Sequence, residues 1–260
     1  MDQYFGICHL SLIPLRAAAS DKSEILSQLL FGDGFEVLET ADNWTFIRTR
    51  GDDYEGWIDS KQYMPLTASE FEKLNAPANV LGISTAQKVK KLSTGEVLYL
   101  TAGCSIPSVV SNRFFLGNEE FELTDPVFSE PGDFAGNIIS CSRFFLHAPY
   151  LWGGRSVFGI DCSGFTQIVF KMLGISLKRD AWQQAEQGSP VNFLQEARAG
   201  DLAFFDNAEG RITHVGIMLN DQEIIHASGR VKIDPVDDQG IYSLDLKKHS
   251  HKLRIIKRYI

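Results

Sequence analysis

The apolar pattern of the chain changes at residue 136, and this change divides the sequence into two kinds of structure. Before that point, short apolar runs alternate with turn residues at close intervals, as in residues 34–40, 44–50 and 54–59. Such spacing is typical of small antiparallel barrels. After it, apolar residues recur with the period of an α-helix. We therefore predict an α+β protein that begins with β-barrels and ends with a domain of helices and strands.

The part before residue 136 is predicted to contain two barrels. Residues 1–67 form the first, and residues 68–79 form a polar or helical connector. Residues 80–135 repeat the pattern of strands and turns more weakly and form the second barrel, which Pro and Gly residues close. Residues 136–260 then form the last domain, which is long enough to bury a core of its own.

Charge and hydropathy narrow the class of partner. The 260 residues carry a formal net charge of −8 without any run of Lys and Arg, which argues against nucleic-acid binding. No window approaches the roughly 20 apolar residues of a spanning helix. Asp2 stands where a secretory signal would carry positive charge. We expect a cytoplasmic protein with a small soluble partner, without membrane association and without an evident obligate protein partner.

Four cysteines are spread along the chain without a C-x-x-C pair, so the sequence predicts neither a zinc cluster nor a disulfide framework. Cys8, Cys104 and Cys141 lie in mostly apolar surroundings, and we expect buried, inert thiols there. Cys162 differs, because it stands between Asp161 and a serine at the start of a run with helical spacing.

The run after Cys162 predicts an amphipathic helix that ends at Gly174. Its apolar positions are Phe165, Ile168, Val169, Met172 and Leu173. Asp161 is expected to cap this helix, and the free N–H groups of the first turn favour a thiolate, the reactive form of cysteine. For a cysteine at such a position alone, we expect packing about three times as often as catalysis, because free cysteine is commonly buried. Evidence for catalysis must come from elsewhere in the chain.

Two histidines supply that evidence. Residues 211–228 predict two strands joined at Asn220 and Asp221, with His214 in the first and His226 in the second. A three-residue loop centred on Asn220 places the histidines directly opposite each other, whereas a two-residue turn places them on opposite faces. A nucleophilic thiol needs a base and a group that orients the base, so catalysis by Cys162 predicts the odd-length loop.

Four segments together resemble the NlpC-type cysteine peptidases of bacterial cell-wall turnover, a branch of the papain-like superfamily. They are APYLWGGRSVFGIDCSGF, AGDLAFF, HVGIM and IIHAS, all within residues 136–260. The resemblance implies a papain-like catalytic domain in which Cys162 is the nucleophile, His214 the general base and His226 the residue that orients it. It also implies that no metal or organic cofactor is required.

The front half resembles the bacterial Src-homology-3-like barrels that precede this domain in murein-recycling members. The segments concerned are residues 14–39, NWTFIR and DDYEGWID. Those relatives are γ-D-glutamyl-L-diamino-acid endopeptidases, so the resemblance implies cleavage, through a thioester, of a murein-derived peptide beside diaminopimelate or lysine. Three other functions stay open: a secreted hydrolase of intact peptidoglycan, an amidase or acyltransferase, and a peptide-binding module with an inactive peptidase domain.

The resemblance also implies residues that stabilise the oxyanion and hold the D-glutamate. Tyr150 and the backbone N–H of Cys162 are the candidate oxyanion donors, and Trp152 lies in the same segment as Tyr150. Ser163 matches a position that contacts the D-glutamate α-carboxylate. Packing is an equal alternative for Tyr150, and an ordinary place in the first helical turn is the alternative for Ser163.

Two carboxylates are candidates for holding the free amino group of the substrate's L-alanine. Asp180 resembles an acidic residue with this role, and Glu55 is a second candidate from the first barrel. Arg179 could instead neutralise Asp180, and Glu55 could be a solvated turn charge. Two carboxylates around one ammonium would demand an unblocked amino terminus, because an amide could not compensate their desolvation.

Overall fold

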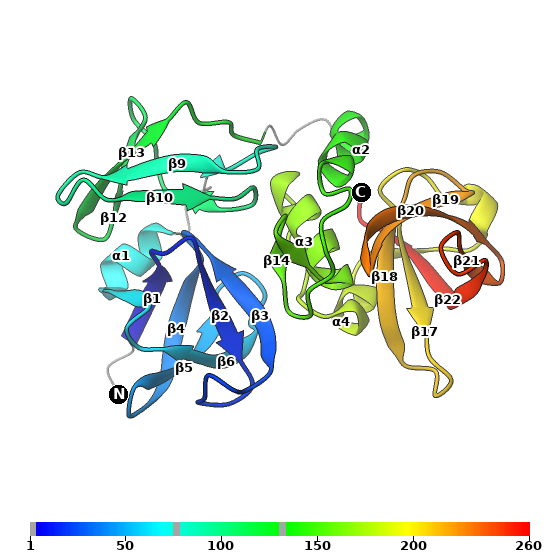
Figure 1. Cartoon of the computed structure of the whole chain (residues 1–260), viewed down its shortest axis with the longest axis horizontal. Helices are drawn as coiled ribbons and strands as arrows, with labels where there is room; N and C mark the ends of the chain where they lie inside the picture. Colours follow the sequence, from blue (N-terminus) through cyan, green and yellow to red (C-terminus); the bar gives the residue numbers. More distant parts are fainter. Residues whose placement is uncertain (1–3, 75–78, 130–133) are drawn as a thin grey trace. The chain divides into compact units, whose positions relative to one another are not determined.

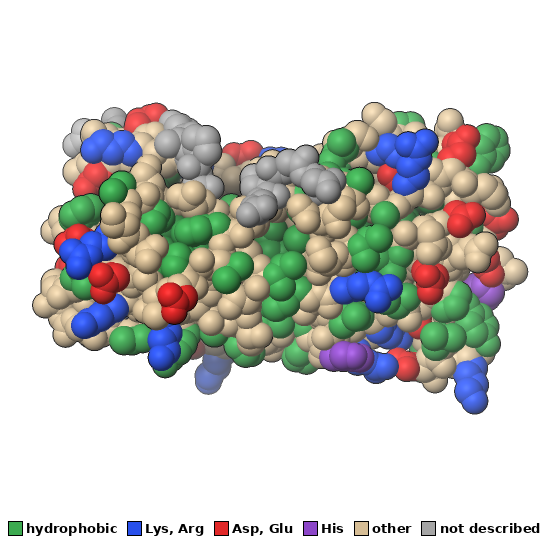
Figure 2. Space-filling view, turned by 90° about the horizontal axis from the view of Figure 1, so that it is seen from above, with side chains coloured by type: hydrophobic (Ala, Val, Ile, Leu, Met, Phe, Trp, Pro, Cys, Tyr) green, Lys and Arg blue, Asp and Glu red, His purple; other side chains and the backbone are tan. Residues whose placement is uncertain are grey.

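The computed structural model describes residues 4–74, 79–129 and 134–260 (Figure 1). The chain forms two compact units, Met1–Glu130 and Pro131–Ile260. None of the helices within the described ranges is both long and apolar enough to cross a bilayer. On the face drawn in Figure 2, acidic, basic and apolar side chains are interspersed instead of being gathered by type.

The first unit begins with a seven-stranded antiparallel sheet in the order β3-β2-β6-β5-β4-β1-β7. Its strands are β1 (Tyr4–Cys8), β2 (Leu12–Arg16), β3 (Ile25–Leu30), β4 (Gly34–Ala41), β5 (Trp44–Thr49), β6 (Glu55–Asp59) and β7 (Tyr63–Leu66). The strands predicted at residues 34–40, 44–50 and 54–59 are confirmed. In β5 and β6, buried residues alternate with more exposed ones, as expected for a sheet with one face against a core.

A short helix lies inside the predicted connector. Helix α1 (Ala68–Lys73) begins after Thr67, whose hydroxyl accepts the Glu70 N–H, while the Glu70 carboxylate accepts the Thr67 N–H. These reciprocal bonds form a capping box, a motif readable in the sequence T-A-S-E. Residues 75–78 of the predicted connector lie outside the described residues.

The rest of the first unit contains a four-stranded antiparallel sheet, β10-β9-β13-β12, and a two-stranded one, β11-β8. The strands are β8 (Asn79–Val80), β9 (Gln87–Lys91), β10 (Val97–Leu100), β11 (Ser105–Ile106), β12 (Arg113–Leu116) and β13 (Glu119–Thr124). Phe31, just after β3, meets the rings of Phe114 and Phe121 edge-on, with centroids 5.9 and 5.7 Å away. The first sheet and the four-stranded sheet therefore share part of their core.

The second unit places its helices first and its sheet last. Its helices are α2 (Phe134–Phe144), α3 (Cys162–Met172), α4 (Ala181–Glu186) and the short 3₁₀ helix η1 (Leu194–Glu196). A small hairpin, β14 (Arg155–Ser156) and β15 (Gly159–Ile160), precedes α3. The domain boundary predicted after residue 135 falls inside α2, because the helix begins at Phe134, whose ring packs edge-on against Phe170 of α3.

The sheet of the second unit closes on itself. Its order is β16-β22-β17-β18-β19-β20-β21, and β22 pairs with β21 as well as with β17. The strands are β16 (Ser189–Val191), β17 (Leu202–Asp206), β18 (Ile212–Met218), β19 (Glu223–Ser228), β20 (Arg230–Asp237), β21 (Gly240–Ser243) and β22 (Lys248–Arg258). Six strands, β17 to β22, thus form a closed ring, which leaves neighbouring strands little freedom to slide.

Helix α3 confirms the predicted amphipathic helix. It begins at Cys162, and Gly174 follows its end with a φ of +80°, the left-handed conformation that glycine adopts readily. All five predicted apolar positions, Phe165 to Leu173, are buried. Helix α3 packs against β18 and β19, the two strands that carry the predicted histidines.

Candidate active site

The loop before α3 holds the start of that helix in a fixed position. The Asp161 carboxylate accepts the Gly164 N–H at 2.7 Å and the Gly153 N–H at 2.8 Å, so the predicted cap is confirmed. A Cβ at residue 164 would lie 2.3 Å from the Gly154 carbonyl oxygen. Glycine at 164 therefore allows the first turn of α3 to lie directly against this loop.

A buried arginine completes the support of the helix start. Arg179, among the largest fully buried side chains of the described residues, donates from Nη2 to the Asp161 carboxylate at 2.6 Å. Its Nη1 donates to the Ser163 hydroxyl at 2.9 Å. The charge of the helix cap is thus matched by a guanidinium, which a buried carboxylate requires. This partnership of Arg179 with Asp161 was not predicted from the sequence.

The Cys162 sulfur is buried, with 6% of the residue exposed, and two backbone N–H groups reach it, those of Ser163 and Val215. N–H groups alternate in direction along a strand, and in β18 that of Met218 bonds to Asp201 on the β17 side. The N–H of Val215, three residues earlier, therefore points toward the β19 side. The β18–β19 ladder begins only at Gly216, which leaves this N–H available to the sulfur.

The histidine register confirms one part of the prediction and corrects another. Gly216 pairs with His226, and Met218 pairs with Ile224, so the loop is odd in length and His214 shares a face with His226. The predicted direct pairing of the two histidines is wrong, because the loop is centred on Asp221. The Asn220 side chain accepts the N–H groups two and three residues later, which makes Asn220 the first residue of the turn.

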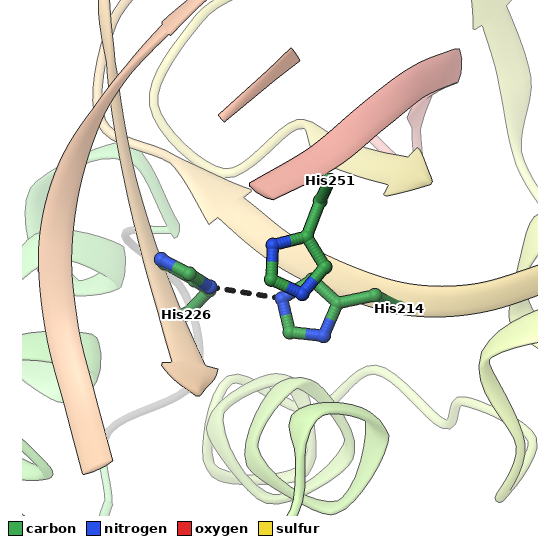
Figure 3. A group of neighbouring side chains, drawn as sticks. All are labelled: His214, His226 and His251. Carbon is green, nitrogen blue, oxygen red and sulfur yellow. Dashed lines mark hydrogen bonds between the residues drawn. The ribbon is translucent and has the colours of Figure 1, made fainter. Parts of the chain in front are cut away.

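The offset of two residues still brings the rings together (Figure 3). His214 Nε2 lies 2.8 Å from His226 Nδ1, and the ring planes are nearly perpendicular. Gly216, directly opposite His226, makes room for this contact, because a Cβ there would lie 2.8 Å from the Cβ of His226. A side chain at residue 216 would push the two strands or the ring apart.

The far side of His226 contacts a carboxylate that sequence reasoning missed. His226 Nε2 lies 3.1 Å from Asp234 Oδ2, and Lys232 Nζ lies 3.2 Å from the same oxygen. The signal was present in the sequence, because Asp234 has the parity of His226 and a hairpin at Gly229 joins their strands. Asp234 and His226 are both buried, so bulk water does not compete for this bond.

A third histidine, also missed, covers the face of His214. His251 of β22 stacks on the His214 ring with centroids 4.1 Å apart and planes at 23° (Figure 3). Nitrogens of His214, His226 and His251 lie within 4.8 Å of one another, a separation that a metal site could use. Imidazole lone pairs lie in the ring plane, however, so two stacked rings do not point at one ion. We therefore interpret the group as one ring, His251, stacked on His214, which is itself hydrogen-bonded to His226.

Two family profiles match the chain: the NlpC/P60 family over residues 147–248, and the bacterial dipeptidyl-peptidase Sh3 domain over residues 15–62. A γ-D-glutamyl-L-lysine dipeptidyl-peptidase of Bacillus subtilis (strain 168) is 34% identical over 219 residues, which cover 78% of this chain and 72% of that protein. The chain belongs to the NlpC/P60 family. It is accordingly a cysteine peptidase.

Two further comparisons extend the likeness over most of the chain. A Bacillus cereus (strain ATCC 10987 / NRS 248) protein with the same name as the B. subtilis one is 29% identical over 85% of this chain and 73% of its own. The crystal structure of an NlpC/P60 family protein from B. cereus ATCC 10987 superposes with a TM-score of 0.81 at 22% identity, over 98% of this chain and 99% of that one. The predicted Src-homology-3-like front part and papain-like rear domain are confirmed.

The Cys162 sulfur of this NlpC/P60 peptidase was expected to be ionised, but its surroundings favour the neutral thiol. Burial raises the pKa of the Cys162 thiol to about 12, and the Asp161 carboxylate adds to the rise, against the opposing N–H groups and Arg179. Burial, together with the nearby His226 and His251, lowers the pKa of His214 well below its usual value. Thiol and imidazole are therefore both neutral near pH 7.

The implied oxyanion donor lies near the sulfur. Burial raises the pKa of Tyr150, and the proximity of Cys162 and Asp161 raises it further. The Tyr150 hydroxyl consequently stays protonated and able to donate a hydrogen bond at neutral pH. Trp152, two residues on, is 59% exposed, which leaves its ring surface accessible to a ligand of the peptidase.

The two carboxylates proposed for the substrate ammonium have different surroundings. Asp180 is partly buried and caps α4, and its backbone N–H donates to the Gln183 side chain at 3.0 Å. Glu55 is exposed at the start of β6, and Arg48 of β5 donates to its carboxylate from Nη2 at 2.7 Å. A substrate ammonium at Glu55 would have to compete with this guanidinium.

Proposed function

We propose that this peptidase hydrolyses the bond between γ-linked D-glutamate and the following L-lysine or diaminopimelate in murein-derived peptides. The names of the B. subtilis and B. cereus relatives support this substrate class. One observation carries the assignment of residues: the Cys162 sulfur contacts the N–H of Val215, the residue that follows His214, whose ring is hydrogen-bonded to His226.

The chemistry follows from these three side chains. As Cys162 Sγ attacks the γ-carbonyl carbon, its proton passes to His214, and a tetrahedral oxyanion forms. The C–N bond then breaks, His214 returns the proton to the departing amine, and a thioester remains on Cys162. Water adds to the thioester with help from His214, which releases the D-glutamyl acid and restores the thiol. His226 holds the base in place throughout.

Neutral reactants make the proton transfer part of the attack itself. A thiol with a pKa of about 12 carries little thiolate at pH 7, so Cys162 and His214 do not form a thiolate–imidazolium ion pair before the substrate binds. Charge appears only as the S–C bond forms, and it needs donors already in place. We propose that the Tyr150 hydroxyl and a backbone N–H at the start of α3, that of Cys162, supply them.

We propose residues that hold the two ends of the substrate. Ser163, fixed by Arg179, is proposed to contact the D-glutamate α-carboxylate. Asp180 is proposed to hold the free ammonium of the L-alanine, with Trp152 offering an exposed ring surface. Glu55 remains the second candidate for the ammonium, in competition with Arg48. A free amino terminus would restrict the enzyme to released peptides, because in intact wall the L-alanine is bound to muramic acid.

Such a substrate favours a role in murein peptide recycling in the cytoplasm, which we propose as the site of action. Cell fractionation tests this proposal, and an extracellular protein would contradict it.

We also propose that residues 80–135 form a second Src-homology-3-like barrel of the α+β chain. Its support is the pair of antiparallel sheets β10-β9-β13-β12 and β11-β8, while residues 130–133 lie outside the described ranges.

Peptide cleavage followed by mass spectrometry tests the proposed activity. We expect L-Ala-γ-D-Glu-L-Lys or its diaminopimelate analogue to yield L-Ala-D-Glu and the free diamino acid, and the N-acetylated peptide to react at least about tenfold more slowly. Cys162→Ala should abolish turnover. Cys141→Ala is the matched control, because both cysteines are 6% exposed on helices of this unit. Turnover by Cys162→Ala near that of the control would contradict covalent catalysis.

A further inference from the structure

We propose that Asp234 is a positioning residue that fixes the proton arrangement of His226 and His214, so that Nδ1 of His214 is the atom that accepts the thiol proton. The proposal rests on the proposed function for the role of His214 as the base. Asp234 is a buried carboxylate, and this role adds it to Cys162, His214 and His226.

The proton arrangement follows from Asp234 outward. Asp234 acts only as an acceptor, because it faces the Leu244 N–H at 3.1 Å and Lys232 Nζ at 3.2 Å. His226 lowers the pKa of Asp234 through its hydrogen bond, against the effect of burial, which keeps the carboxylate ionised. His226 must therefore carry its proton on Nε2, the nitrogen 3.1 Å from Asp234.

The proton on His226 Nε2 determines which nitrogen of His214 is protonated. A neutral imidazole carries one N–H, so protonated Nε2 leaves Nδ1 of His226 as an acceptor. This Nδ1 lies 2.8 Å from Nε2 of His214, which must be the donor. His214 consequently has its free lone pair on Nδ1. We call His214, His226 and Asp234 the relay. In the relay, His214 donates to His226, and His226 donates to the Asp234 carboxylate.

The sheet builds the relay on three adjacent strands. His226 of β19 lies two residues from the position directly opposite His214 of β18, and Asp234 of β20 lies two residues from the position directly opposite His226. Diagonal neighbours of this kind are within reach of long side chains. All three residues are at least nine-tenths buried, so water cannot readily replace a missing partner.

Without the carboxylate, the opposite arrangement becomes accessible. An amide NH₂ at residue 234 could donate to His226 Nε2, which would move the His226 proton to Nδ1 and the His214 proton to its own Nδ1. His214 could then no longer accept the thiol proton. In a serine peptidase, the equivalent exchange of aspartate for asparagine lowers kcat by about 10⁴-fold because it leaves the histidine in the wrong tautomer.

Asp234→Asn tests the proposal, with Asp237→Asn as its matched control. Asp237 lies on the same strand and also contacts a histidine, His249 at 3.0 Å, but this pair is at the surface and outside the relay. We expect Asp234→Asn to lower kcat by about 10²–10⁴-fold with little change in KM. Alkylation of Cys162 by iodoacetamide at pH 7 should slow as well. Asp237→Asn should leave both rates unchanged.

Nitrogen-15 NMR of histidine-labelled protein reads the arrangement directly. In the wild type, we expect Nε2 of His214 and of His226 to carry hydrogen, and both Nδ1 atoms to lack it. Protonated Nδ1 on wild-type His214, or kinetics of Asp234→Asn equal to those of Asp237→Asn, would overturn the proposal. The wild-type spectrum decides the matter even if Asp234→Asn fails to fold.

Failure of the proposed function gives a different pattern. Neither alkylation nor the NMR spectrum depends on which peptide is the substrate. If the wild type shows the expected protons and Asp234→Asn slows alkylation, but L-Ala-γ-D-Glu-L-Lys is not cleaved, the relay stands and only the substrate assignment is wrong. If the peptide is cleaved but the protons are reversed, the relay is wrong and the peptidase assignment stands.

Discussion

Two arginine–carboxylate pairs, one in each unit, have nearly the same length and very different surroundings. Arg179 Nη2 lies 2.6 Å from Asp161 in the catalytic unit, with side chains 1% and 6% exposed. Arg48 Nη2 lies 2.7 Å from Glu55 in the front unit, with 42% of each side chain exposed. Distance alone would rank the pairs as equals. Their burial predicts that they contribute differently to the protein.

An exposed ion pair exchanges contacts with water for contacts of similar strength, so its loss often has no measurable effect. A buried pair cannot lose one partner without leaving an uncompensated charge in the interior. Arg179 also donates to Ser163, and Asp161 also caps α3. The buried pair therefore links stability to the position of the nucleophile, whereas the exposed pair joins two neighbouring strands, β5 and β6, at the surface.

Arg179→Met should give the largest effect, because it leaves the buried Asp161 carboxylate without its counterion. We expect the unfolding free energy of the catalytic unit to fall by about 3–5 kcal/mol in urea titrations. The Cys162 thiol should also react more slowly with iodoacetamide, because Arg179 lowers its pKa and Asp161 raises it.

Arg48→Met is the matched control for this change. The same substitution at the exposed pair should leave the urea midpoint and the rate of Cys162 alkylation unchanged. Equal destabilisation by the two variants would contradict the conclusion that burial separates the pairs. The thiol reactivity distinguishes a local electrostatic effect from a general loss of structure, since partial unfolding would expose Cys162 and speed its alkylation.

The sequence predicted the parts of the site that depend on local pattern. Helical spacing after Cys162 located α3, and the aspartate before the cysteine identified its cap. Parity placed His214 and His226 on one face, because side chains alternate strictly along a strand. The precise pairing failed because it depends on how the Asn220 side chain starts the turn, a choice between loop geometries that periodicity does not contain.

The remaining parts depend on how distant segments meet. Arg179 reaches Asp161 only because the loop after α3 folds back under the helix start, and His251 covers His214 only because β22 closes the ring of strands. Burial also reversed the expected charge of Cys162, since desolvation and the Asp161 charge outweigh the helix N-terminus. Hydrophobic patterning reports which face is buried, but it does not report which buried polar groups become neighbours.

Asp161→Asn should give an effect of intermediate size and opposite sign on the thiol. The neutral side chain can still cap α3 but no longer raises the pKa of Cys162, while Arg179 continues to lower it. We expect the pH profile of Cys162 alkylation to shift to lower pH and the rate at pH 8 to rise roughly tenfold, the change that one pKa unit brings. Glu55→Gln, its control, should not shift the profile.

Peptide mapping by mass spectrometry separates Cys162 from the other buried thiols. If Asp161→Asn shifts the profile to higher pH, or accelerates Cys8, Cys104 and Cys141 equally, the cap charge does not control the nucleophile. In the first case, the helix start has moved away from the Val215 N–H. In the second, the variant has loosened the fold.

Glu55→Gln should have the smallest effect of these variants. Because Arg48 already donates two hydrogen bonds to the Glu55 carboxylate, its loss removes an exposed pair and should not change the urea midpoint measurably. We expect KM for the free-amine peptide to stay within about twofold, whereas Asp180→Asn should raise it about tenfold, as loss of a charged hydrogen bond does. A tenfold rise in KM with Glu55→Gln would instead show that the substrate ammonium displaces Arg48, and the exposed pair would then be a component of specificity.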